Sequence, residues 1–379
     1  MTAKRARVIA VAFVIPMLGQ PAAAQTDTSS WTSDKIVTPA ERSGGTKLLK
    51  TAPFQAPGQV RLPPTGKGGV VTTRAPVPGV PILPSDVPID GTTISKTGAG
   101  ADPAYEAFDL GRYKSALELA KAAAERNEPQ AATLIGRIYQ EGLGVGRDDV
   151  EAAQWYRRGA ELGDTNAMFA FGVMLADGGA IKRDHQGAAQ MFEKAASKGH
   201  VIANYDLALL FLTGEGKPEN PRRAFAHMQY AANAGLANAQ YDLATLYATG
   251  TGVDANAFEA AKWFKKAAEA GLADAQLDYG VILFQGKGTP PDQKEGAEMF
   301  RRAAEKGNIV AQNRLARCLA QGAGVPANPV AAIKWYLIAK SNGGIDDAEL
   351  DRTAAKLSKA DRLKAEQAAA QWRELVLVR

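Results

Sequence analysis

The chain has 379 residues, of which 46% are hydrophobic, enough to pack either several ordinary domains or one long repeat array. Its single cysteine, Cys318, excludes an intramolecular disulfide and a cysteine-based metal cluster. The formal net charge of +5 arises before residue 101, because residues 101–379 hold 34 basic and 35 acidic side chains. The charge therefore gives no basis for a nucleic-acid partner.

The first 24 residues have the pattern of a secretory signal. Three basic residues precede an apolar run at 8–18, and alanines at 22–24 come just before Gln25. Small residues at these positions suit signal peptidase, so we expect cleavage after Ala24. The run is about half the ~20 apolar residues of a spanning helix. We expect a secreted protein without stable membrane insertion, periplasmic if the source is a Gram-negative bacterium.

Residues 25–100 hold ten of the twenty prolines and ten glycines, among many serines and threonines. Such a segment buries too little apolar surface to offset the entropy of ordering, so we predict a disordered linker. Its expected role is a tether for the folded part of the chain. A proline-rich docking motif is the alternative, although the spacing matches no recognition pattern.

The rest of the chain repeats every 36 residues through six units, because three ladders of small residues keep this interval. The opening alanines are Ala131, Ala167, Ala203, Ala239, Ala275 and Ala311. The turn glycines are Gly142, Gly178, Gly214, Gly250, Gly286 and Gly322. The closing glycines are Gly163, Gly199, Gly235, Gly271, Gly307 and Gly343.

Each unit reads as two helices. Helix A, as at 131–141, has its apolar residues on one helical face. A small residue recurs among them, and we expect it to let a neighbouring backbone approach. Helix B begins at Asp or Asn in every unit, where the side chain can accept hydrogen bonds from unpaired helix N–H groups. Glu151, Glu259 and Glu295, three residues after such caps, complete capping boxes, and the closing glycine suits a left-handed C-cap.

A Gly-x-Gly-Val turn occurs at 142–145, 250–253 and 322–325, and an aromatic pair follows in helix B at 155–156, 263–264 and 335–336. This unit resembles the Sel1-like repeat, a relative of the tetratricopeptide repeat, over residues 131–343. Units two and three depart from it, since Ala180 replaces a turn glycine and Met191 and His227 replace the tryptophan. The resemblance implies an all-α, right-handed superhelical solenoid of helix-turn-helix repeats, with about 16 helices and no strand.

Taken together, these patterns divide the chain into five predicted segments. They are a signal peptide at 1–24, a linker at 25–100, an N-terminal capping helix pair at 101–130, six repeats at 131–345 and C-terminal capping helices at 346–379. End units are expected because terminal repeats must cover their outer faces.

The sequence shows no recognisable set of catalytic residues. His227 takes a packing position in helix B, His185 lies in a turn and His200 follows a closing glycine, and no two have metal-ligand spacing. Cys318 falls at a core position of helix A, where burial leaves a thiol unreactive. No Lys-Ser or Lys-Thr follows the glycine turns to make a phosphate loop. We therefore expect no enzyme activity, metal or cofactor.

Rows of amides, aromatics and aspartates on helix A are the candidates for partner binding. In related repeats the A helices line the concave face, where amides can pair with an extended backbone and carboxylates favour a basic partner. Packing between repeats explains the aromatics equally well, and a solvated helix face explains the aspartates. The candidates are Phe169, Tyr205, Asp206, Gln240, Tyr241, Asp242, Gln276, Asp278 and Gln312.

The resemblance implies a protein–protein interaction scaffold or regulator in the cell envelope, binding a protein or peptide on the concave face. The alternative is a structural module for cell-wall glycan, which exposed rings at Phe169, Tyr205 and Tyr241 would favour. A β-lactam-binding or β-lactam-hydrolysing relative is disfavoured, because such members carry two cysteines in each repeat and this chain has one.

Overall fold

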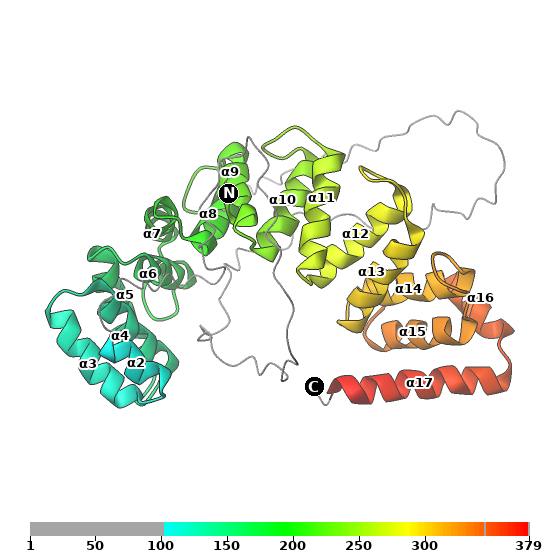
Figure 1. Cartoon of the computed structure of the whole chain (residues 1–379), viewed down its shortest axis with the longest axis horizontal. Helices are drawn as coiled ribbons and strands as arrows, with labels where there is room; N and C mark the ends of the chain where they lie inside the picture. Colours follow the sequence, from blue (N-terminus) through cyan, green and yellow to red (C-terminus); the bar gives the residue numbers. More distant parts are fainter. Residues whose placement is uncertain (1–101, 345, 378–379) are drawn as a thin grey trace, which may run out of the picture. The chain divides into compact units, whose positions relative to one another are not determined.

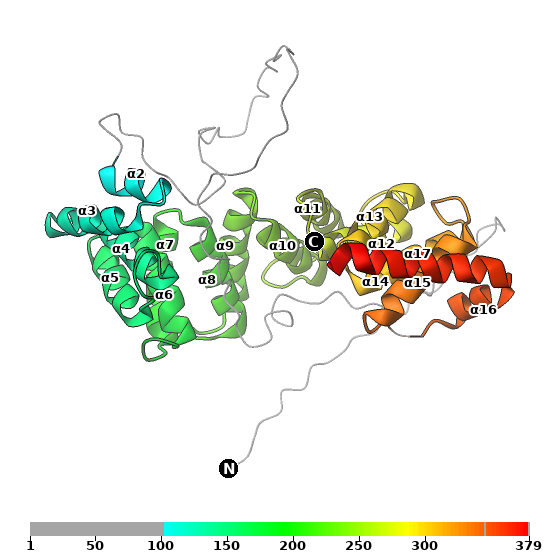
Figure 2. The ribbon, with the colours of Figure 1, turned by 90° about the horizontal axis from the view of Figure 1, so that it is seen from below.

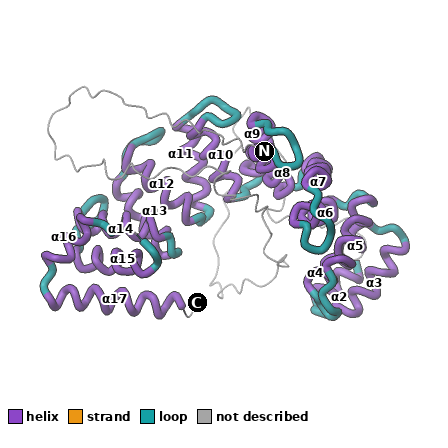
Figure 3. The backbone as a smooth tube through the Cα atoms, turned by 180° about the vertical axis from the view of Figure 1, so that it is seen from behind, coloured by secondary structure: helices purple, strands orange, loops and turns teal. Residues whose placement is uncertain are grey.

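The computed structural model describes residues 102–344 and 346–377, so the predicted signal peptide and linker lie outside the described residues. In this part of the chain the regular elements are sixteen α-helices without a strand, which confirms the all-helical prediction (Figure 3). They are α2 (Pro103–Asp109), α3 (Tyr113–Glu125), α4 (Pro129–Glu141), α5 (Asp149–Glu161), α6 (Thr165–Asp177), α7 (His185–Ser197), α8 (Val201–Thr213), α9 (Pro221–Asn233), α10 (Ala237–Thr249), α11 (Ala257–Glu269), α12 (Ala273–Gln285), α13 (Gln293–Glu305), α14 (Ile309–Gln321), α15 (Pro329–Ser341), α16 (Ala348–Lys356) and α17 (Lys359–Leu377).

Each repeat contributes one A helix and one B helix, and each helix packs on its neighbours in the sequence. The A helices are α4, α6, α8, α10, α12 and α14, and the B helices are α5, α7, α9, α11, α13 and α15. Figures 1 and 2 show helices α2 to α15 side by side in chain order, from two directions, and α17 alongside α15. The repeats therefore form a solenoid, with α2 and α3 before them and α16 and α17 after them.

Helix B begins in every repeat at the predicted Asp or Asn. Each cap side chain accepts a backbone hydrogen bond, as Asp292 does from the Glu295 N–H at 2.9 Å. The second half of the capping-box prediction is wrong, because the N–H of each cap donates to a helix A carbonyl of its own repeat. Asp292, for example, donates to the Leu283 carbonyl at 3.0 Å. The six caps are Asp148, Asp184, Asn220, Asn256, Asp292 and Asn328.

The turn and closing glycines end the helices in left-handed backbone, with φ of 65–76° after helix A and 86–97° after helix B. This confirms the predicted C-caps. A second turn glycine also brings neighbouring repeats together. A Cβ added to Gly252 would lie 2.0 Å from the carbonyl oxygen of Pro221, one repeat earlier. The second repeat has Ala180 there, and its turn follows another path, since Ala180 does not have a positive φ.

The recurring small residue of helix A makes room for a side chain from helix B of the same repeat. A Cβ on Gly136 would meet the Tyr156 ring at 2.8 Å, and one on Gly172 would meet the Phe192 ring at 2.7 Å. We expected a neighbouring backbone to approach at this position. That expectation is wrong at these two glycines, because an aromatic ring fills the space.

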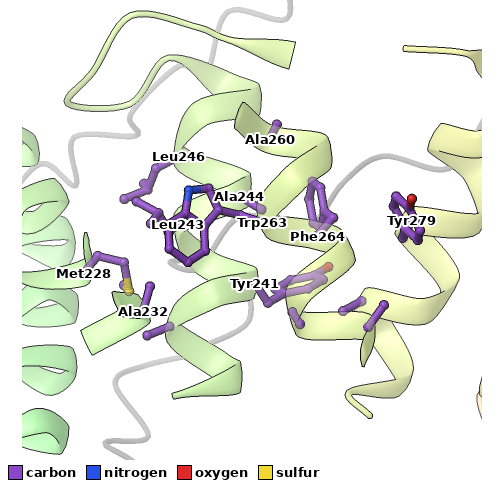
Figure 4. Packing of buried hydrophobic residues seen from close by; sticks show 14 of the residues in the cluster. Met228, Ala232, Tyr241, Leu243, Ala244, Leu246, Ala260, Trp263, Phe264 and Tyr279 are labelled. Carbon is purple, nitrogen blue, oxygen red and sulfur yellow. The ribbon is translucent and has the colours of Figure 1, made fainter. Parts of the chain in front are cut away.

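The core consists of several clusters, each of which extends across neighbouring helix pairs. The largest buried cluster runs from Tyr205 in α8 to Met299 in α13 and joins alanines to a smaller number of large side chains. Figure 4 shows part of it, with Trp263 beside the leucines of α10 and the ring of Tyr241 next to that of Phe264. Because each helix pair shares its apolar face with the next pair, no repeat has a complete core of its own.

Candidate functional site

The glutamines of the predicted amide row tie α10, α12 and α14 each to the B helix before it. Gln276 Nε2 donates to the Ala268 carbonyl of α11 at 3.1 Å, and Gln312 Nε2 donates to the Ala304 carbonyl of α13 at 3.2 Å. Gln240 makes the equivalent bond to α9 at 3.3 Å. Each amide thus adds a hydrogen bond in the last turn of a helix, where intrahelical donors run out.

The tyrosine and aspartate rows join successive A helices. The Tyr205 hydroxyl donates to Asp242 Oδ2 at 2.8 Å, and the Tyr241 hydroxyl donates to Asp278 Oδ2. Donor and acceptor are 37 residues apart in both pairs, so each hydroxyl reaches the carboxylate of the following repeat. Phe169 occupies the tyrosine position one repeat earlier and has no hydroxyl to donate.

These contacts bury eight of the nine candidate residues and half-bury the ninth, Asp278. Asp206 and Gln312 are 0% exposed, and Gln240, the most exposed of the eight, is 9% exposed. The expectation that these side chains stand on an open surface is therefore wrong. The glutamines, the tyrosines and Asp242 are held in the seams by hydrogen bonds between helices, and Phe169 is buried by ring packing. Direct contact of these residues with a partner stays a prediction.

The aromatic row packs within the array. The Phe169 ring stacks on His200, with centroids 4.6 Å apart, and Tyr241 meets Phe264 edge-on at 5.3 Å. The exposed fractions of Phe169, Tyr205 and Tyr241 are 8%, 7% and 3%. Of the two explanations open for this row, the structure supports packing.

A polar network at the junction of repeats two and three has no counterpart among the sequence predictions. His200 is the N-cap of α8, and its Nδ1 accepts from the Ala203 N–H at 3.0 Å. Asn204 donates to the His200 carbonyl at 2.9 Å, and its Oδ1 lies 2.9 Å from His227 Nδ1. His227 also stacks on Phe211, in agreement with its predicted packing role, while His185 is the first residue of α7 rather than a turn residue.

Cations that reach back one repeat form a second contact missed at the sequence level. Lys198 Nζ donates to the Gly163 carbonyl at 2.9 Å, and Lys306 Nζ donates to the Gly271 carbonyl. Both pairs are 35 residues apart, a spacing visible in the sequence once the closing glycines are aligned. A cation there complements the negative end of the preceding B helix.

The end of helix A stays accessible in the later repeats. Its last residue is Thr249 in α10, Gln285 in α12 and Gln321 in α14, and all three are exposed. We call these three residues the helix A end row. They lie 36 residues apart, beside the turn glycines, so the array presents an uncharged polar side chain at a regular interval.

Residues suited to catalysis do not gather in the described segments. No group of three or more His, Cys, Asp or Glu side chains there could hold a metal ion. Cys318 is fully buried in α14, and burial raises the pKa of its thiol to about 12, so it stays protonated. Within residues 102–344 and 346–377, no helix has the length and apolar character needed to cross a membrane.

Comparison with known proteins agrees with this architecture. The family model described as "Sel1 repeat" matches residues 129–164, 165–200, 201–236, 237–272, 273–308 and 309–344. A Sel1 repeat protein from Oxalobacter formigenes is 27% identical with a TM-score of 0.58, over 64% of this chain and 100% of that chain. The protective antigen c5321 of uropathogenic Escherichia coli is 28% identical with a TM-score of 0.50, over 72% of this chain and 68% of that chain. No curated protein matches significantly.

Proposed function

The chain belongs to the Sel1 repeat family, whose members generally act as protein–protein interaction scaffolds, and from this premise we propose that it is a non-enzymatic scaffold or regulator. Its partner is a protein or peptide that lies along the A helices. The observation that carries the proposal is the unbroken register of six repeats. A long array of repeats at one spacing suits an extended partner better than a small molecule.

The hydrogen bonds between repeats support this use of the A helices. Each amide fixes an A helix to the preceding B helix, and each tyrosine fixes it to the next A helix. A partner then meets a surface that is already ordered, so little entropy is lost on binding. We propose that the buried candidates act by holding the helices in place, while the helix A end row makes the contact.

The charge of the array favours neither a basic nor an acidic partner, because residues 101–379 hold 34 basic and 35 acidic side chains. Asp206 and Asp242 are buried, so they do not argue for a basic partner, which stays a prediction. The glycan alternative has less support. It requires rings on an open surface, whereas Phe169, Tyr205 and Tyr241 are almost fully buried.

A pull-down with matched variants tests the proposal. In one variant Thr249→Lys and Gln285→Lys add two charges to the helix A end row. In the control Asn233→Lys and Gln293→Lys add the same two charges to exposed positions on α9 and α13, which are B helices. We expect a partner crosslinked in the cell envelope to be retained by the control and lost from the first variant, with equal circular dichroism for both. Retention by both variants contradicts the proposed face.

Export to the cell envelope is a separate part of the proposal, supported by the basic, apolar and alanine-rich pattern of residues 1–24. N-terminal sequencing of the protein purified from its natural host tests it. A mature chain that begins at Gln25 is expected, and a chain that retains residues 1–24 in the cytoplasm would refute export.

A further inference from the structure

The three histidines of the chain all lie in or beside one junction. His185 and His200 belong to the second repeat and His227 to the third, and the remainder of the sequence has none. Any response of the array to protonation near neutral pH is therefore concentrated at the seam between α7, α8 and α9. We call the group His200, Asn204 and His227 the histidine seam.

His200 performs a task that requires its neutral form. As the N-cap of α8, its Nδ1 accepts a hydrogen bond from the Ala203 N–H, so that nitrogen carries no proton. Two other A helices have caps that keep an acceptor in mild acid. Asp164 accepts from Ala167 at 2.7 Å, and Asn308 accepts from Ala311 at 2.9 Å. The N-cap residues of α4, α10 and α12 make no side-chain cap hydrogen bond, so His200 is the one A-helix cap among the described repeats that depends on a neutral imidazole.

Asn204 couples this cap to the next B helix. Its amide nitrogen donates to the carbonyls of His200 and Ala196, so its oxygen is the acceptor that faces His227. His227 Nδ1 must then donate. The chain of contacts runs from α7 through α8 to α9, and a change at His200 is transmitted to both neighbouring helices.

We propose that the histidine seam is an acid-sensitive element, which opens reversibly between the second and third repeats when its histidines become protonated. A proton on His200 Nδ1 removes the acceptor of the cap. It also places a positive charge at the N-terminus of α8, where the helix dipole opposes it.

The surroundings of the two rings set the direction of the effect. His200 lies against Phe169, and burial lowers its pKa to about 4. Burial and then Arg223 lower the pKa of His227, while Glu193 opposes them. Glu193 is itself paired with Lys217 at 2.7 Å. The other polar groups nearby are Lys198, at the C-cap of α7, and the Tyr230 hydroxyl of α9, which donates to the Gly199 carbonyl.

Both rings bind a proton more weakly in the folded chain than in the open one. The seam is therefore fully stable above the ordinary histidine pKa of about 6.5 and loses stability as the pH falls toward 4. We expect the equilibrium constant for opening to rise on the order of tenfold between pH 7.5 and pH 5.

Hydrogen exchange of the full chain, followed by mass spectrometry at pH 7.5 and pH 5.0 and corrected for intrinsic rates, tests the proposal. We expect faster exchange at pH 5.0 in peptides from α7, α8 and α9, with α12 to α14 unchanged. His200→Asn, which copies the cap of Asn308, should remove most of this difference. His200→Asp, which copies Asp164, serves as a second variant if the first does not fold.

The control is His185→Asn, which leaves the histidine seam intact and should respond to pH like the natural chain. The proposal is overturned if His200→Asn and His200→Asp keep the full response to pH. It is equally overturned if acid accelerates exchange evenly along the array. Neither outcome concerns the helix A end row, so the proposed function is tested independently of the histidine seam.

Discussion

Single side chains decide how one repeat is held to the next. Asp206, Asp242 and Arg314 are charged residues at equivalent positions of three A helices, and each is at most 3% exposed. Removing a charge from water is costly unless hydrogen bonds and opposite charges replace the solvent. For Asp242 the Tyr205 hydroxyl is one such replacement. Polar groups buried in this way favour one register between repeats, since a shifted register would leave them unsatisfied.

Tyr241→Phe tests the contribution of the tyrosine row. The change keeps the ring against Phe264 and removes only the hydroxyl that donates to Asp278. A lost hydrogen bond to a charged group costs about 1.5–3 kcal/mol, and the half-exposure of Asp278 places the expected loss near the lower end. Urea unfolding measures it. The control is Tyr247→Phe in the same helix, whose hydroxyl has no hydrogen bond within the described residues and should change stability by less than about 0.5 kcal/mol.

Gly252→Ala tests one of three equally close backbone approaches between repeats. The added Cβ meets the Pro221 carbonyl oxygen at 2.0 Å, so we expect a loss above about 2 kcal/mol from the clash and the left-handed backbone together. Gly307→Ala is the matched control, because its φ is also positive but no atom lies within 4 Å. It should cost about 1 kcal/mol. Equal losses for the two variants in thermal melts would show that the contact between repeats contributes nothing.

At the scale of elements, the helices are set mainly by local sequence. The Asp or Asn cap, the apolar face and the closing glycine of each B helix lie within about 16 residues of one another, and all were predictable. The contacts of the candidate side chains join glutamines to carbonyls 8 residues earlier, on the preceding B helix, and tyrosines to aspartates 37 residues later. Their formation depends on how one repeat rotates against the next, which a single 36-residue pattern does not reveal. The amide, aromatic and aspartate rows of helix A could therefore be recognised in the sequence, while the burial of their side chains could not.

Asp292→Ala and Glu295→Ala separate the two halves of the capping box. Asp292 accepts the Glu295 N–H, so its loss should cost about 1 kcal/mol. The N–H of Asp292 donates to Leu283, so Glu295 contributes only its charge near the helix N-terminus, worth about 0.3–1 kcal/mol when exposed. Chemical denaturation of both variants checks this order. A larger loss of stability for Glu295→Ala than for Asp292→Ala would indicate that the complete capping box forms.

At the scale of the whole array, stability is a sum of repeats and the seams between them, because each helix contacts mainly its neighbours in sequence. The apolar clusters follow this pattern, since each draws on adjacent repeats. The family match identifies the architecture and the general role as a protein-interaction scaffold. It leaves the partner to be found by experiment on the surface that the seams leave accessible.

Destabilisation at one seam should stay local. In Gly252→Ala we expect faster hydrogen exchange in α9, α10 and α11, on both sides of the affected contact, and unchanged exchange in α14 and α15. This follows from contacts limited to neighbouring helices. Loss of protection throughout residues 102–344 would show instead that the array unfolds as a single cooperative unit.

If a protein partner lies on the A helices, a probe at an exposed A-helix end should contact it. A photoreactive phenylalanine analogue is placed at Gln285 of α12 and, in a parallel sample, at Asn233 of α9, since both positions are exposed helix ends. Irradiation in the intact cell envelope is predicted to crosslink one protein from position 285 and none from position 233. A crosslink from position 233 alone, or the same crosslink from both, would show that the partner does not bind on the A helices.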